Sequence, residues 1–83
     1  MDGRLEKARK RIDALDRAVA RLLDRRFALA AALGPLKKKA RDPRREARVL
    51  ANISRLTRPG FRKAARAAYA EIIKQSRLLQ GRR

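Results

Sequence analysis

Apolar residues recur at alternating spacings of three and four over the N-terminal part of the chain. The positions are Leu5, Ala8, Ile12, Leu15, Val19, Leu22, Leu29 and Leu33. This is the heptad pattern of a helix whose apolar stripe is buried against other helices. It predicts a long first helix from about Arg4 to at least Leu33.

Arg26 interrupts this stripe. The same alternation assigns position 26 to the buried face, where an apolar side chain is expected. A guanidinium cannot lose its charge, and burying it without a partner is costly. The sequence therefore predicts one of two outcomes: Arg26 bends out to water, or an anion meets it inside the fold.

Two breaks separate further helices from the first. Proline lacks the N–H for a helical hydrogen bond, so Gly34-Pro35 predicts a kink or an end, followed by a basic loop to Arg41. Asp42-Pro43 combines an N-cap acceptor with proline at the first helical position, which predicts a second helix to about Leu56. Residues 57–60 form the next break, and a third helix should run over 61–80. The positions expected to face inward are Val49, Leu50 and Ile53 on the second helix and Phe61, Ala65, Ala68, Tyr69, Ile72, Ile73 and Leu79 on the third.

Length and composition limit the class of protein. With 83 residues, the chain is one all-α domain, 1–83, with a small core of its own. A long apolar stripe on so short a chain indicates oligomerisation, most simply a two-fold dimer. The absence of cysteine and histidine excludes disulfides, thiolate nucleophiles and histidine triads, and no metal or other cofactor is expected. No apolar run could span a bilayer and no signal peptide is recognisable, so a cytoplasmic protein without membrane contact is expected.

The formal net charge of +17 is the strongest compositional signal. It is compatible with a solvated basic surface, and also with attraction of nucleic acid, of an acidic protein partner or of a small anionic substrate. Charge alone does not choose among these partners.

A few polar residues continue the apolar stripes of the predicted helices. They are Arg9 and Arg26 on the first helix, Asp42 and Glu46 at the start of the second, and Ser76 and Gln80 on the third. Taken singly, most have simple structural explanations, such as a helix-dipole contact for Glu46 or a backbone hydrogen bond for Ser76. Together they indicate a polar pocket inside a helical bundle.

The chemistry of this set suits a dicarboxylate ligand. Two arginines match two carboxylates through forked hydrogen bonds. A carboxylate such as Glu46 accepts a hydroxyl proton, and an amide with a nearby lysine can donate to an ether or enol oxygen. No activated nucleophile is present, so chemistry would depend on holding a reactive conformer and stabilising developing charge.

The chain resembles the all-helical (AroQ-class) chorismate mutases from about Leu5 to Gln80. The motifs are Arg9-x-x-Ile12-Asp13-x-Leu15-Asp16, Leu22-Leu23-x-x-Arg26-x-x-Leu29-Ala30, Lys37, Asp42-Pro43-x-Arg45-Glu46-x-x-Val49-Leu50 and Ile72-Ile73-x-x-Ser76-x-x-x-Gln80. The resemblance implies three helices per chain and an intertwined homodimeric bundle formed along the long first helices. It also implies rearrangement of chorismate to prephenate, on the route to phenylalanine and tyrosine, with no cofactor or covalent intermediate.

The resemblance also implies a role for each matching residue. Lys37 would bridge a substrate carboxylate and the breaking ether oxygen, Gln80 would donate to that oxygen, and Glu46 would bind the ring hydroxyl. The spacing between Lys37 and Asp42 is shorter than is usual in the family, so Lys38 or Lys39 is an alternative.

The remaining implied residues bind the substrate. Arg26 would hold one carboxylate, and Arg9 donated across the interface from the partner chain would reach the other. The backbone around Asp42 would support the hydroxyl contact, and Ser76 would contact a carboxylate edge.

Three alternatives remain open at this point. Isochorismate-pyruvate lyase shares the fold and a similar pocket, although Glu46 and Gln80 are more typical of the mutase. A nucleic-acid-binding helical module is favoured by the charge, but the aromatic content of 4% and the lack of a base-reading motif disfavour it. A helical dimerisation module without a ligand would have no use for a cation at Arg26.

Overall fold

The structure, a computed structural model, describes residues 2–36 and 41–81. Its helices are α1 (Arg4–Leu33), α2 (Pro43–Leu56) and α3 (Arg62–Gly81), with short 3-10 turns η1 (Gly34–Leu36) and η2 (Pro59–Phe61). No strand occurs within these described ranges. The all-α class and the positions of the predicted helices are confirmed.

The helix boundaries have the local causes that the sequence predicted. Asp42 is the N-cap of α2, where its Oδ1 accepts a hydrogen bond from the Arg45 backbone N–H at 3.1 Å, and Pro43 is the first helical residue. At the other break, α1 ends at Leu33, and Gly34-Pro35 tighten the chain into the 3-10 turn η1. The break therefore ends the α-helix at the proline-containing turn.

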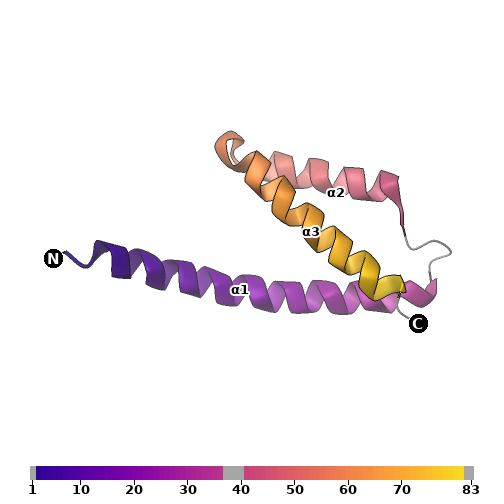
Figure 1. Cartoon of the computed structure of the whole chain (residues 1–83), viewed down its shortest axis with the longest axis horizontal. Helices are drawn as coiled ribbons and strands as arrows, with labels where there is room; N and C mark the ends of the chain where they lie inside the picture. The colour runs from indigo at the N-terminus through magenta and orange to yellow at the C-terminus, as the bar shows by residue number, and fades with distance from the viewer. Residues whose placement is uncertain (1, 37–40, 82–83) are drawn as a thin grey trace.

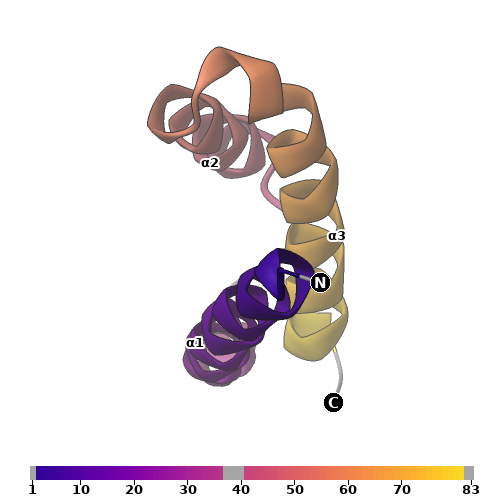
Figure 2. The ribbon, with the colours of Figure 1, turned by 90° about the vertical axis from the view of Figure 1, so that its left-hand side faces the viewer.

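Helix α1 is long, and α2 and α3 form a V-shaped hairpin beside it (Figure 1). Helices α2 and α3 diverge from the turn at η2, and the C-terminal part of α3 reaches the C-terminal part of α1 (Figure 1). Seen approximately along α1, helix α3 lies on one side, and α1 and α2 lie on the other (Figure 2). Contacts of α3 with both other helices therefore hold the chain together.

Two arginines close the narrow end of the hairpin. Arg62 Nε donates to the carbonyl oxygens of Ser54 at 2.7 Å and Thr57 at 3.0 Å. Arg66 Nη1 donates to Ser54 Oγ at 2.8 Å. These bonds satisfy acceptors at the C-terminal end of α2, where carbonyl groups lack helical partners. Part of the positive charge is therefore structural.

Two inward predictions on the third helix are wrong for the single chain. Phe61 is exposed, with the Arg58 guanidinium carbon 5.2 Å from its ring centre, because it belongs to η2 and not to the α3 face. Ala68 is also exposed and lies at the edge of that face. Tyr69 and Ile73 occupy its centre and are half-buried and buried, respectively.

A single chain covers little apolar surface. Its Cα radius of gyration is 16.0 Å, whereas a compact domain of this length would have about 12 Å. Within the described residues the buried hydrophobic side chains are Ala30 and Ile73. The stripe of α1 remains uncovered, with Leu15 66% and Leu29 69% exposed. The homodimer that would cover it stays a prediction.

Gly34 lets the end of α1 approach the end of α3. A Cβ at this position would lie 2.5 Å from the Gln80 carbonyl oxygen, a backbone atom that cannot rotate away. The φ of Gly34 is −49°, so alanine fits the backbone and would gain about 1 kcal/mol from helix propensity. The steric cost, about 1–3 kcal/mol for an over-packed site, outweighs that gain.

We therefore expect Gly34→Ala to lower the melting temperature by several degrees, about 4–8 °C for each kcal/mol lost. Circular dichroism during heating measures it. Gly60→Ala is the control, because a Cβ there meets nothing within 4 Å. A Gly34→Ala melting temperature equal to or above that of the unchanged protein would contradict the close approach.

Candidate active site

The three helices line a cavity of about 260 Å³ that is partly open to solvent. It is lined by Arg26, Leu29, Ala30 and Leu33 of α1, Asp42, Arg45, Glu46 and Val49 at the start of α2, and Ile73, Ser76, Arg77 and Gln80 of α3. This volume is slightly below the usual range for small-molecule sites, about 300–1,000 Å³. Most of the polar residues that the sequence placed on the inward faces therefore meet around one cavity.

Arg26 stands in the wall of this cavity. Its Nη1 donates to Ser76 Oγ at 2.7 Å, and its guanidinium carbon lies 5.1 Å from the centre of the Tyr69 ring. The side chain is half-buried, and it makes no ion pair with any residue of the described ranges. A hydroxyl and a ring face hold the cation in place without neutralising it. Arg26 is thus not released to water, and no anion of the described residues 2–36 and 41–81 pairs with it.

Ser76 fixes the direction of Arg26. Its side chain is buried, and its Oγ donates to the Ile72 carbonyl oxygen at 2.8 Å while accepting from Arg26. A hydroxyl has one proton to donate, and the Ile72 carbonyl takes it. In this conformation Ser76 orients the guanidinium and has no second proton to offer to a ligand.

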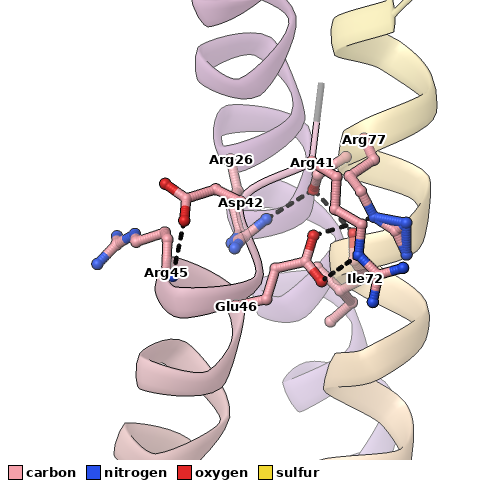
Figure 3. A network of polar contacts seen from close by, with 8 residues as sticks. Arg26, Arg41, Asp42, Arg45, Glu46, Ile72 and Arg77 are labelled. Carbon is pink, nitrogen blue, oxygen red and sulfur yellow. Dashed lines mark hydrogen bonds and ion pairs between the residues drawn. The ribbon is translucent and has the colours of Figure 1, made fainter. Parts of the chain in front are cut away.

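The Glu46 carboxylate faces two arginines, Arg41 and Arg77 (Figure 3). Its side chain is 17% exposed, with Oε2 at 3.1 Å from Arg77 Nε and Oε1 at 3.6 Å from Arg41 Nε. Arg77 was missed by the sequence reasoning, although its spacing of four residues from the inward-facing Ile73 was a signal for it. The structure therefore adds a cation to the predicted site.

Asp42 and Gln80 complete the predicted set around the cavity. Both line it, and Gln80 is half-buried on the last turn of α3. The Asp42 carboxylate caps α2. The predicted lysines Lys37, Lys38 and Lys39 lie outside the described residues.

Arg9 does not reach the cavity of its own chain. It is exposed and pairs with Glu6 at 3.2 Å on the same helix. Arg26 follows it by seventeen positions, which is about 25 Å along an α-helix. Only another chain could bring an Arg9 to this cavity, so its donation across an interface stays a prediction.

Other predictions from the sequence concern metals, membranes and macromolecules. Within the described ranges no group of acidic residues is arranged to hold a metal ion. None of the helices there is long and apolar enough to cross a membrane. A cytoplasmic location, and binding of an acidic protein or of nucleic acid through the remaining cations, stay predictions.

The fold and the cavity define a class: an all-helical protein with arginine side chains in the wall of a small pocket. The sequence model of the family described as chorismate mutase type II matches residues 8–81, so the chain belongs to this family. The match confirms the resemblance and indicates an isomerase that acts on chorismate, and it does not favour the lyase alternative. Neither a curated protein nor a solved structure matches the chain significantly.

Proposed function

We propose that the cavity between α1, α2 and α3 is the site where chorismate is rearranged to prephenate. The observation that carries this proposal is Arg26, a half-buried guanidinium without an acidic partner among the described residues. Removing a cation from water without pairing it is unfavourable, so the site is poised for an anionic ligand. A substrate with carboxylates supplies the missing charge.

Arg26 binds one carboxylate of chorismate in this proposal. A guanidinium forms two parallel hydrogen bonds with a carboxylate, which fixes orientation as well as charge. The 2.7 Å bond to Ser76 sets the plane of the group before the substrate arrives. Ser76 lies at the edge of the same carboxylate and contributes to its binding by orienting Arg26.

The second carboxylate is met by Arg9 of a second copy of the chain. Support comes from the exposed apolar stripe of α1, in which Leu5, Ile12, Leu15, Val19, Leu22, Leu29 and Leu33 are all uncovered. Fully covering one such side chain contributes about 1.5–3 kcal/mol. Two chains joined along α1 would bury the stripe and bring the N-terminal part of one helix to the cavity of the other.

The remaining residues act on the ring hydroxyl and the ether oxygen. Glu46 accepts a hydrogen bond from the ring hydroxyl, and the backbone near Asp42 supports this contact. Gln80 and a lysine, Lys37 by its position in the motif, donate to the ether oxygen of the breaking bond. Negative charge grows on that oxygen in the transition state, so these donors bind the transition state more tightly than the substrate. No covalent intermediate is required, because the pocket selects the reactive conformer.

The purified chain tests this proposal directly. Incubated with chorismate, it should form prephenate; incubated with isochorismate, it should release no pyruvate. Both reactions are followed by chromatography against the uncatalysed rate. Pyruvate from isochorismate without prephenate from chorismate would instead assign the lyase reaction.

A further inference from the structure

Arg77 is a charged residue of the cavity to which the proposed reaction gives no task. Its side chain is 28% exposed, and its buried Nε lies 3.1 Å from Glu46 Oε2. The contact is an ion pair, but the N–H does not meet hydrogen-bond geometry. The guanidinium therefore acts on Glu46 mainly through its charge and its bulk.

The pair spans the wide end of the α2–α3 hairpin. Glu46 lies near the N-terminus of α2 and Arg77 near the C-terminus of α3, where the two helices have diverged (Figure 1). The bonds of Arg62 and Arg66 close the opposite, narrow end. Arg77 is thus the α3 residue that forms an ion pair with the Glu46 carboxylate, which faces the cavity.

The ion pair between Arg77 and Glu46 matters for a dianionic ligand because Glu46 is itself negatively charged. Glu46 is 17% exposed, so water screens it poorly, and its own charge would repel the carboxylates that Arg26 attracts. Arg41 also faces Glu46, but at 3.6 Å and with a 65% exposed side chain it contributes little. The nearer and more buried Arg77 offsets most of the Glu46 charge while leaving carboxylate lone pairs open to a hydroxyl donor.

We propose that Arg77 is a positioning residue that makes Glu46 compatible with a dianionic substrate. This proposal rests on the proposed function and deepens it. Arg77 holds the Glu46 carboxylate near α3 and offsets its negative charge. The hydroxyl contact of Glu46 is then kept without repulsion of the ligand's carboxylates. The effect falls chiefly on KM, because repulsion weakens binding of the substrate and the transition state alike.

Kinetics of Arg77→Gln test the proposal. We expect kcat/KM to fall about tenfold to a hundredfold, mostly through KM, since one member of a poorly solvated charge pair is removed. Lys74→Gln is the matched control, because Lys74 is exposed on the same helix and its loss changes the net charge equally. Arg77→Lys keeps the charge and should recover part of the loss.

A double-mutant cycle separates positioning from other roles. In a Glu46→Gln background there is no charge left to offset, so adding Arg77→Gln should change KM little. Additive effects would overturn the proposal, because Arg77 would then act on the ligand itself or only on folding. An Arg77→Gln variant that matches Lys74→Gln would overturn it as well.

A binding measurement keeps this test independent of turnover. Calorimetry with a bicyclic dicarboxylate mimic of the transition state should show about tenfold weaker binding to Arg77→Gln than to Lys74→Gln. If the unchanged chain forms no prephenate, the proposed function fails, and this comparison alone decides on Arg77: equal affinities overturn its role and weaker binding supports it.

Discussion

Replacing Arg26 with leucine is expected to lower kcat/KM by about a thousandfold, the upper end of what loss of one transition-state contact costs. The proposed forked bond to a substrate carboxylate would be lost, and Ser76 would have no guanidinium left to orient. Steady-state assays of prephenate formation measure the loss. Folding should not suffer, because an unpaired half-buried cation is replaced by an apolar group of the stripe.

Arg25→Leu serves as the control for this change. Arg25 is exposed on the same helix, so its substitution removes the same charge without touching the cavity. Size-exclusion chromatography and thermal melts should show both variants folded and in the oligomeric state of the unchanged protein. If Arg26→Leu keeps the activity of Arg25→Leu, Arg26 is a tolerated surface cation and the active-site assignment is lost.

Mixing two inactive variants should restore activity. In the proposed homodimer, Arg9→Ala and Arg26→Leu would each remove a carboxylate contact from every site. In a mixed dimer, the chain that keeps Arg26 receives an intact Arg9 from its partner, so one site of the two is complete. Half of randomly paired dimers are mixed, and about a quarter of the original activity should return after joint unfolding and refolding.

The pairing of variants provides its own control. Arg26 and Gln80 line the cavity of one chain, so mixing Arg26→Leu with Gln80→Ala leaves every site incomplete and should restore nothing. Native mass spectrometry confirms that mixed dimers have formed. Mixed dimers of Arg9→Ala and Arg26→Leu without activity would show that Arg9 does not complete the neighbouring site.

Local sequence signals were enough to predict the helices. The breaks at Gly34-Pro35 and Asp42-Pro43 depend on single residues whose backbone chemistry is strongly restrictive, and both lie where expected. Phe61 was misplaced because a proline-glycine turn separated it from the helix whose spacing it continued. A periodicity describes a face only within one uninterrupted helix.

The candidate site was predictable where polarity conflicted with an apolar pattern. Arg26 stands out because its neighbours on the stripe are aliphatic, whereas Arg77, although it follows Ile73 by four positions, is one of many cations on a basic chain. Its proximity to Glu46 depends on how far α2 and α3 diverge, which no local pattern encodes. The close approach of Gly34 to Gln80 depends likewise on the crossing of α1 and α3.

The scarcity of buried side chains has a consequence for how this molecule is measured. Ala30 and Ile73 are the buried apolar residues of the described chain, so apolar burial stabilises an isolated copy only weakly. Folding of the chain and its association with a second copy would then be one bimolecular step. A melting point would carry meaning only alongside the molarity of the sample, and dilution would act on this protein as a denaturant does.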